Sequence, residues 1–354
     1  MSNAASDPNA LDTTNLIPWL EEHVVGFGGY RAITKFGDGQ SNPTYGIEAE
    51  SGRYVLRAKP PGELLKSAHA VDREFRVMSA LADTDVPVPK MLALSEEGDE
   101  SPIGRQFFVM EHLDGRILWD PALPELGEGA KANAKRGRIY DSMNKTLAAL
   151  HAVDPMAAGL ETFGRPGNYF ARQTDRWAKQ YRASEVEHNQ QVHDVIAWLE
   201  ANMPEDGGQV TIVHGDYRLD NMIFAHDSED VIGVLDWELS TLGHPMGDLS
   251  YQCMNWRLPN GDGSRGLMGI DRPAIGLPTE EEYVETYCRR RGISDVGNWS
   301  FYVSYNLFRF LAILQGVYKR ALDGNASNPE RAKQMANAIP LLAAAAMHEI
   351  ENHG

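Results

Sequence analysis

Three polar residues, Asp216, Asn221 and Asp236, occur at a spacing that suits phosphoryl transfer. Asp216 and Asn221 lie five positions apart in the segment VHGDYRLDNMIF (213–224), and Asp236 follows fifteen positions later at the end of an apolar run. The amide oxygen of Asn and the carboxylate of Asp are ligands of the kind that Mg²⁺ prefers. A carboxylate beside an attacking hydroxyl can orient that hydroxyl and accept its proton. The apolar stretches on either side predict short strands that would hold the polar groups in place.

The same residue types also have a structural interpretation. Single Asp and Asn residues in loops commonly cap helices or close Asx-turns. That interpretation does not explain the ordered set HGD, N and LDW, which follows the order of a kinase catalytic loop and its metal-binding Asp. The order of the set therefore favours the chemical interpretation.

The elements around this segment fall into two groups. In the first third of the chain, alternating apolar residues bounded by turn formers predict strands over 31–36, 44–49, 53–59, 90–96 and 106–112. Apolar residues at helical spacing predict a helix over 66–82. From about residue 130 the pattern is mostly helical, with late helices over 280–291, 299–322 and 330–351. We predict an α+β, bilobal fold. Its N-terminal lobe is a small five-stranded antiparallel sheet with one helix, and its C-terminal lobe is larger and mostly helical.

The boundary between these lobes is expected after the segment VMEHLDG, near residue 115. We expect residues 1–25 to form a flexible leader and a first helix. Residues 26–115 would form the nucleotide-binding lobe, and residues 116–354 the catalytic and acceptor-binding lobe.

The motifs HGDYRLDN and VLDWE resemble those of the aminoglycoside phosphotransferase family, also called the phosphotransferase enzyme family, within the kinase-like fold. The segments GDGQSNPTY and LDWELSTLGHPMGDLSY narrow the resemblance to the kinase-like domain associated with acyl-CoA dehydrogenases. The resemblance covers about residues 30 to 320. It implies that Asp216 is the catalytic base, that His214 braces the catalytic loop, and that Asn221 and Asp236 bind Mg²⁺. It also implies that Asp248 steadies the loop by hydrogen bonding and takes no part in the chemistry.

The nucleotide side departs from the usual kinase pattern. Arg57 occupies the strand position where a kinase lysine holds the α- and β-phosphates, and Glu74 follows seventeen positions later on the predicted helix. Arginine can bind phosphates bidentately and pair with Glu. Lys59 lies on the same face of the strand and could share the task. The structural alternative is a surface ion pair that contributes little to stability.

Two further segments are expected to contact ATP, or GTP in its place. The turn GDGQSN (37–42) would cover the phosphates through Gly39, Ser41 and Asn42. It is not a Walker A loop, because GxxxxGK[ST] is absent from the sequence. By resemblance, the backbone of Glu111 and Leu113 would meet the adenine edge.

Composition limits the partners of the chain. The 354 residues carry a formal charge of −17, which argues against a nucleic-acid or anionic-membrane binder. The two cysteines form no CxxC pair, and the N-terminal segment lacks the features of a signal peptide. No apolar run approaches the roughly 18 residues of a membrane helix. We expect a cytoplasmic protein that binds neither nucleic acid nor membranes, and whose oligomeric state the sequence leaves open.

Several functions compete at this point. The first is a small-molecule kinase whose hydroxyl acceptor is a hydroxyacyl-CoA, by the narrower resemblance, or an aminoglycoside or other amino-sugar, by the broader one. The second is a non-catalytic nucleotide-binding pseudokinase, which Arg57 in place of Lys would support and the intact set of Asp216, Asn221 and Asp236 opposes. An acyl-CoA would need an apolar groove and basic groups for its phosphates. Aromatic candidates, which could equally be core residues, are Tyr251, Trp256 and Tyr305, and basic candidates, which could equally be surface residues, are Arg257, Arg265 and Arg309.

Overall fold

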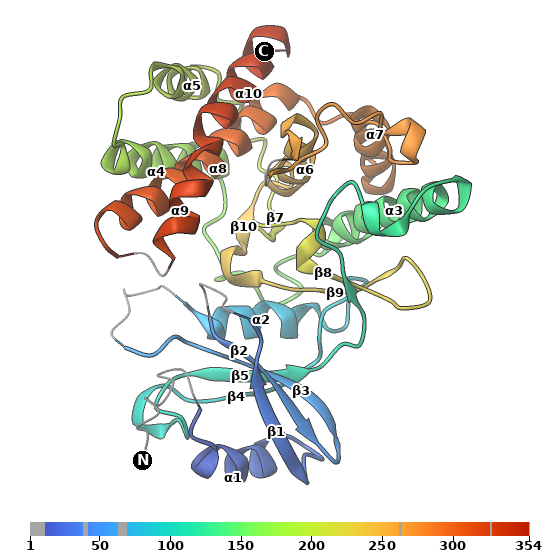
Figure 1. Cartoon of the computed structure of the whole chain (residues 1–354), viewed down its shortest axis with the longest axis vertical. Coiled ribbons are helices and arrows are strands. Elements are labelled where there is room, and N and C mark those ends of the chain that lie inside the picture. The colour runs from blue at the N-terminus through green and yellow to red at the C-terminus, as the bar shows by residue number, and fades with distance from the viewer. Residues whose placement is uncertain (1–10, 38–41, 63–68, 262–263, 326–327, 354) are drawn as a thin grey trace. The chain divides into compact units, whose positions relative to one another are not determined.

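The computed structural model describes residues 11–37, 42–62, 69–261, 264–325 and 328–353 (Figure 1). The chain divides into two compact units. The first comprises Met1–Gly115 and Ile232–Glu238, and the second Arg116–Val231 and Leu239–Gly354. The short segment Ile232–Glu238 contains Asp236 and belongs to the first unit, whereas the single boundary expected from the sequence assigned it to the second.

The first unit is built on a five-stranded antiparallel sheet with the order β1-β2-β3-β5-β4. Its strands are β1 (Tyr30–Lys35), β2 (Thr44–Ala49), β3 (Gly52–Ala58), β4 (Met91–Leu94) and β5 (Phe107–Glu111). Two helices accompany the sheet, α1 (Thr13–His23) and α2 (Val71–Leu81), and a short 3₁₀ turn covers Gly98–Glu100. The predicted five-stranded antiparallel sheet is therefore confirmed. Helix α2 falls inside the predicted range 66–82, of which residues 66–68 lie outside the described part of the chain.

Alternation along the strands gives the sheet two different faces. Leu56, Ala58 and Phe107 point into an apolar cluster with Leu16 and Leu20 of α1. The neighbouring residues point the opposite way, as successive side chains of a strand must. Phe108 meets Phe75 of α2 with ring centroids 6.2 Å apart, and Arg57 reaches Glu74 of α2. The side of the sheet that carries Arg57 is therefore the side that α2 covers.

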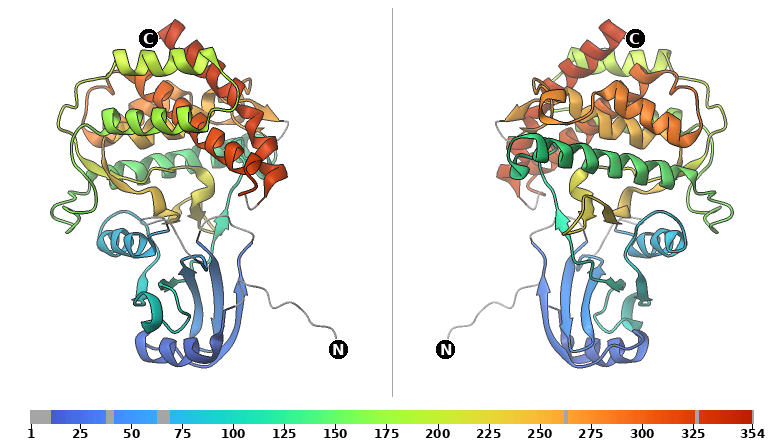
Figure 2. Two further views of the ribbon diagram at one scale, coloured as in Figure 1. Left: turned by 90° about the vertical axis from the view of Figure 1, so that its left-hand side faces the viewer. Right: turned by 90° about the vertical axis from the view of Figure 1, so that its right-hand side faces the viewer.

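The second unit is mostly helical. The long helix α8 contacts α4, α5, α6, α9 and α10 and forms the centre of this unit (Figure 2). The helices are α3 (Ala130–Ala152), α4 (Tyr169–Ser184), α5 (Gln190–Ala201), α6 (Met246–Cys253), α7 (Glu280–Arg291), α8 (Trp299–Leu322), α9 (Pro329–Ala336) and α10 (Ala338–His353). Helices α7 and α8 match the predicted ranges. The helix predicted over 330–351 is instead two helices that meet at Asn337. Pro340 stands in the first turn of α10, where its missing N–H has no helical partner to lose.

Short strands frame the polar segment in the second unit. Strand β7 (Thr211–Val213) pairs with β10 (Thr241–Gly243), and β6 (Arg116–Ile117) pairs with β8 (Met222–Phe224). A 3₁₀ turn over Leu219–Asn221 leads directly into β8. Strand β9 (Val231–Val234) begins in the second unit and continues into the first, where the turn Trp237–Leu239 begins. The remaining short elements are β11 (Asn260–Gly261), β12 (Ser264–Arg265) and 3₁₀ turns over Pro124–Leu126, Met254–Arg257 and Pro273–Ile275.

Among the helices that the structure describes, none combines the length and the hydropathy needed to span a membrane.

Candidate active site

In the first unit, Arg57 is the centre of a cluster of ionic and hydrogen-bonding contacts. Its Nε lies 2.9 Å from Oε2 of Glu74, and its Nη2 donates to Oδ1 of Asp236 at 2.9 Å. The same Nη2 lies 3.7 Å from Oε2 of Glu238, and Nη1 donates to the hydroxyl of Thr44 at 3.2 Å. The guanidinium therefore joins β2, β3, α2 and the segment that carries Asp236. The structure brings together the predicted pair Arg57 and Glu74, and it adds Asp236 to that pair.

Asn42 supports this cluster from the end of the glycine-containing turn. Its Nδ2 donates to Oε1 of Glu74 at 2.7 Å, so its Oδ1 faces Nδ1 of His69, 3.0 Å away. Because an amide oxygen can only accept, Nδ1 of His69 is the donor. Asn42 is buried and is thus a support for Glu74.

The cluster carries more negative than positive charge. One guanidinium faces the carboxylates of Glu74, Asp236 and Glu238. Burial, with Asp236 and Glu238 nearby, raises the pKa of Glu74 to about 7 against the opposing attraction of Arg57. Burial lowers the pKa of Arg57, but the three carboxylates outweigh it and hold that pKa above its ordinary value. The guanidinium is charged, and the excess negative charge favours a cation beside it.

The backbone of Asp236 is held in an uncommon conformation. Its φ is +65°, in the left-handed region, which costs about 1 kcal/mol for a residue other than glycine. Hydrogen bonds on either side fix this turn: Val234 N donates to Pro87 O at 2.8 Å, and Trp237 Nε1 donates to Val234 O at 2.9 Å. The carboxylate of Asp236 remains 34% exposed, so it can accept a ligand in addition to Arg57.

The other residues predicted to bind nucleotide lie elsewhere in the first unit or outside its described part. Lys59 pairs with Glu97, and the structure does not bring it into the Arg57 cluster. Glu111 ends β5, where its side chain accepts from Lys90 N at 2.7 Å, and Leu113 is half-buried in the segment that follows. Gly39 and Ser41 lie outside the described residues.

In the second unit, hydrogen bonds fix both carboxylate oxygens of Asp216. Oδ1 accepts from the hydroxyl of Tyr251 at 2.6 Å, and Oδ2 accepts from Nδ2 of Asn221 at 2.9 Å. The same Nδ2 donates to the backbone oxygen of Asp216 at 2.9 Å, so the other terminal atom of the Asn221 amide is its oxygen. Nε of Arg218 lies 3.4 Å from Oδ2. Asp216 is thereby held in one orientation while its side chain stays 17% exposed.

The backbone before Asp216 is anchored by Asp248, which begins the sequence DLSY on α6. Its two oxygens accept from His214 N at 2.7 Å and from Gly215 N at 2.8 Å. This confirms that Asp248 steadies the loop by hydrogen bonding. Gly215 has a φ of +85°, and a Cβ there would lie 2.7 Å from the Leu239 carbonyl oxygen, so the position requires glycine.

Asp248 is itself held by a buried chain of hydrogen bonds. Nε2 of His151 lies 3.2 Å from Oδ2 of Asp248, and Nδ1 of His151 lies 2.7 Å from the hydroxyl of Tyr287. Burial lowers the pKa of His151 more than Asp248 raises it, so the ring is neutral. Burial raises the pKa of Asp248, but the contacts with His151, His214 and Gly215 outweigh it and lower that pKa overall. A neutral His151 therefore donates from Nε2 to an ionised Asp248 and accepts from Tyr287.

His214 lies inside this framework. It is fully buried, and its Nδ1 accepts from the backbone N of Asp216 at 3.2 Å. This contact braces the loop from within, and it leaves the hydrogen of a neutral ring on Nε2.

Two residues at the loop were not identified from the sequence as site residues. Tyr251 was considered only for an acyl groove, yet it is buried and donates to Asp216. Arg309 was considered for CoA phosphates, yet it is buried, donates to the Gly215 carbonyl oxygen at 2.5 Å and lies 5.2 Å from the Tyr251 ring. The sequence DLSY places Tyr251 three positions after Asp248, on one side of a helix, and this spacing is the signal that could have indicated it.

The remaining acceptor candidates are structural in the part of the chain that is described. Trp256 and Tyr305 are buried within the helical unit. Arg257 pairs with Glu280 at 2.5 Å and with Glu349 at 2.7 Å, so its charge is already compensated. The side chain of Arg265 lies outside the described part of the chain.

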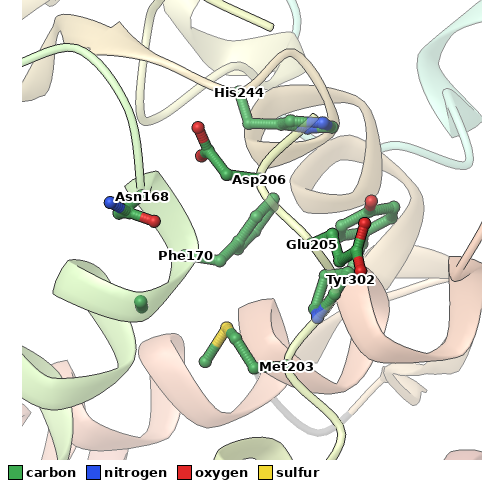
Figure 3. A pocket seen from close by; sticks show the side chains of 9 residues that line it. Asn168, Phe170, Met203, Glu205, Asp206, His244 and Tyr302 are labelled. Carbon is green, nitrogen blue, oxygen red and sulfur yellow. The ribbon is translucent and has the colours of Figure 1, made fainter. Parts of the chain in front are cut away.

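A small separate pocket of about 40 Å³ opens in the second unit (Figure 3). It is lined by Asn168, Phe170, Ala171, Met203, Pro204, Glu205, Asp206, His244 and Tyr302. Burial lowers the pKa of His244 to about 4, so its ring is neutral near pH 7. None of the predicted site residues that the structure describes lines this cavity, which makes it distinct from the catalytic loop.

Comparison with known proteins gives a consistent result. A sequence profile described as the phosphotransferase enzyme family matches residues 32–296. A crystal structure from Ralstonia eutropha, named provisionally as an aminoglycoside phosphotransferase, is 45% identical. It covers 97% of this chain and 99% of its own, with a TM-score of 0.86. Spectinomycin phosphotransferase, solved with ADP and spectinomycin, is 12% identical with a TM-score of 0.61 over 95% of this chain and 98% of its own, which shows the fold alone.

The curated relatives are longer proteins. Acyl-CoA dehydrogenase family member 10 of Mus musculus is 45% identical over 87% of this chain and 29% of its own length. Acyl-CoA dehydrogenase family member 11 of Homo sapiens is 38% identical over 90% of this chain and 41% of its own length. The chain thus spans less than half of the relatives that it matches.

The sheet with its Arg57–Glu74 pair, the helical unit with its HGD loop, and these matches agree with one another. The chain belongs to the phosphotransferase enzyme family.

Proposed function

We propose that this chain transfers the γ-phosphoryl group of ATP, or of GTP, to a hydroxyl of a small metabolite, with Asp216 as the general base. The observation that carries the proposal is the hydrogen bonding of Asp216. A carboxylate offers about four lone-pair positions, and the contacts from Tyr251 and Asn221 use one on each oxygen. Asp216 therefore keeps the capacity to accept a hydrogen bond from an acceptor hydroxyl.

The chemical step that we assign to Asp216 is proton acceptance. The acceptor hydroxyl oxygen forms a bond to the γ-phosphorus while the bond from that phosphorus to the β–γ bridging oxygen breaks. The nucleoside diphosphate leaves with the bridging oxygen, and the hydroxyl proton moves to Asp216. Tyr251 and Asn221 hold the base in one orientation, which limits the loss of entropy on reaching the reacting geometry.

For the nucleotide, we assign Arg57 to the phosphates and Glu74 to the orientation of Arg57. Asn42 supports Glu74, so these two residues help to set where the guanidinium points. Lys59 is a weaker candidate, because Glu97 already compensates its charge. We retain Gly39, Ser41, Glu111 and Leu113 as nucleotide contacts on the basis of the family resemblance.

The residues present fit a bound Mg²⁺. Around Arg57, three carboxylates outnumber one guanidinium, and Asp236 remains partly exposed. In the second unit, the amide of Asn221 is fixed with its oxygen away from Asp216. Asp236 and Asn221 are therefore the residues that we assign to the metal. Mg²⁺ would screen the negative charge of the phosphates when it is bound.

For the acceptor, we favour a hydroxyacyl-CoA. The support is the identity of about 40% to members of the acyl-CoA dehydrogenase family, in which this chain corresponds to a part of a longer protein. An amino-sugar such as an aminoglycoside is the alternative, supported by the name of the Ralstonia eutropha structure. A non-catalytic nucleotide-binding protein is the second function, and the substitution of Arg57 for the kinase lysine is what supports it.

A transfer screen tests the proposal directly. The chain is incubated with Mg²⁺ and γ-labelled ATP against hydroxyacyl-CoAs, aminoglycosides, choline and simple sugars, with Asp216→Asn as the blank. Label in an acceptor, absent from the blank, supports the kinase. Nucleotide binding without transfer to any acceptor, in both proteins alike, supports the non-catalytic function instead.

A further inference from the structure

The connection between α4 and α5 gathers three side chains that can ligate metal ions. Glu185 follows the last residue of α4, His188 lies in the connection, and His193 lies in the first turns of α5. Figure 2 shows α4 and α5, in yellow-green, side by side. One potential ligand atom from each of the three residues lies within 4.8 Å of the others. The short connection thus brings a carboxylate and two imidazoles to one point.

The separations of the ligand atoms suit a single ion. Nε2 of His193 lies 2.9 Å from Oε1 of Glu185, and Nδ1 of His188 lies 3.6 Å from the same oxygen. A four-coordinate ion with bonds of about 2.0–2.1 Å holds its ligand atoms about 3.4 Å apart. The two observed separations lie on either side of that value, so small side-chain adjustments would complete the geometry.

The orientation of His188 points to a cation. Nε2 of Gln190 donates to Asp194 at 2.8 Å, so Oε1 of Gln190 is the atom that lies 3.2 Å from Nε2 of His188. Nε2 of His188 must then carry the hydrogen. In a neutral ring this leaves the lone pair of Nδ1 on the side of Glu185, 3.6 Å away, where either a proton on Nδ1 or a metal ion between the two atoms would remove the repulsion. A ligating histidine commonly donates its other N–H to an oxygen in this way.

Neighbouring groups hold the other two side chains in position. Burial raises the pKa of Glu185, but the hydrogen bonds from His193 and from Asn189 N outweigh it, so that pKa is lowered and the carboxylate is ionised. The ring of His193 stacks on His188 at 4.8 Å and meets Tyr181 edge-on at 6.0 Å. These contacts hold Glu185 and His193 close to each other.

We propose that Glu185, His188 and His193 form a binding site for a divalent transition-metal ion such as Zn²⁺, which would cross-link the connection between α4 and α5. Imidazole ligands select such ions over Mg²⁺, so this site is chemically distinct from one made of carboxylate and amide oxygens. The side chain of His188 is 66% exposed, which leaves room for a water molecule as a fourth ligand. Binding through Nε2 of His193 replaces the hydrogen bond that this atom makes with Glu185.

The test uses the full chain, stripped of metal with a chelator and kept in excess Mg²⁺. Titration with Co²⁺ should give visible d–d absorption that saturates at one ion per chain and disappears when Zn²⁺ is added. Zn²⁺ should also raise the melting temperature by linkage. His188→Gln should weaken both responses at least about 10-fold. Gln190→Ala should weaken Co²⁺ binding without changing the stoichiometry.

Two controls separate this site from others. His348→Gln removes an exposed histidine on α10 and should leave the Co²⁺ titration unchanged. Asp236→Ala removes the carboxylate assigned to Mg²⁺ and should also leave it unchanged. The proposal is overturned if the wild-type chain gives no Co²⁺ absorption, or if His188→Gln titrates as the wild-type chain does. Because the readout is spectroscopic, the result does not depend on whether the chain is a kinase.

Discussion

The hydroxyl of Tyr251 donates to Oδ1 of Asp216 across 2.6 Å, and the Tyr251 side chain is buried beside Arg309. A hydrogen bond to a carboxylate is roughly twice as strong as one between neutral groups. Tyr251 is thus a positioning residue for the proposed base. It fixes which face of Asp216 remains open to an acceptor.

Replacing Tyr251 with Phe should lower kcat by about 10-fold or more while the nucleotide KM stays nearly constant, because only the orientation of Asp216 changes. Tyr217→Phe is the matched control. The Tyr217 hydroxyl is also buried and donates to the Met143 carbonyl oxygen at 2.7 Å. Its removal should therefore lower stability while leaving the hydrogen bonds to the Asp216 side chain in place. Steady-state kinetics on both variants, with urea unfolding alongside, make the comparison. Equal effects on kcat would assign Tyr251 a purely structural role.

Asp216→Asn tests proton acceptance. The change keeps the size of the side chain and removes most of its basicity, so transfer should fall about 100-fold or more. Nucleotide affinity, measured by calorimetry, should change little. Asp220→Asn is the control in the same loop, because Asp220 pairs with Arg218 at 3.2 Å and has no proposed role in the chemistry. Near-normal turnover by Asp216→Asn would show that another group accepts the proton.

The sequence predicted the sheet and the helix α2 because these depend on local patterns. Period-two alternation put Arg57 and Leu56 on opposite faces, whereas the pairing of Arg57 with Glu74 came from the kinase pattern of a strand cation and a helix carboxylate. Helix ends were less well predicted, as the division between α9 and α10 shows.

What the sequence could not predict are contacts that depend on tertiary packing. Tyr251 and Asp216 meet because α6 packs beside the loop, and the spacing of Tyr251 from Asp248 indicates only that these two residues share one side of a helix. The same holds for His151, which reaches Asp248 from α3. Asp236 was predicted as a metal ligand, but its pairing with Arg57 joins positions too far apart for a local pattern.

Substitutions of Arg57 and Lys59 distinguish which of the two residues binds the nucleotide phosphates. Arg57→Ala should weaken nucleotide binding and slow transfer together, because it removes the only described guanidinium that contacts both Glu74 and Asp236. Arg57→Lys should recover part of the loss, since a lysine keeps the charge and loses the bidentate geometry. Lys59→Ala is the control and should have a small effect, as its partner is the exposed Glu97. A silent Arg57→Ala with a severely impaired Lys59→Ala would transfer the role to Lys59.

The raised pKa of Glu74 predicts how stability varies with pH. Its folded-state pKa is about 7 and its ordinary value 4.5, so the folded chain binds this proton more tightly than the unfolded chain. Protonation of Glu74 therefore contributes its full share to the free energy of unfolding below about pH 4.5. That contribution is lost as pH rises through about 7. Relative to Glu74→Gln, the wild-type free energy of unfolding should fall on the order of 2 kcal/mol between about pH 5 and pH 8.

Urea unfolding of the two proteins across that range measures the difference, and the comparison cancels the other titrating groups. Adding Mg²⁺ alone should reduce the difference, because positive charge beside the cluster favours ionised Glu74. Parallel stability curves for the two proteins would mean that Arg57 keeps Glu74 ionised throughout.

The identity of the acceptor is the last prediction, and it separates the two acceptor classes. A 4-hydroxyacyl-CoA should be phosphorylated with a higher kcat/KM than kanamycin, since the relatives to which this chain is about 40% identical belong to the acyl-CoA dehydrogenase family. The matching acyl-CoA without the hydroxyl should bind as a competitive inhibitor and accept no phosphate, because the reaction needs the oxygen and the proton of that hydroxyl. Arg257 and Arg309 are already engaged with Glu280, Glu349 and Gly215, so neither is expected to hold the CoA phosphates. If kanamycin is the better acceptor, the hydroxyacyl-CoA assignment is wrong, while the roles given to Asp216 and Arg57 still stand on their own tests.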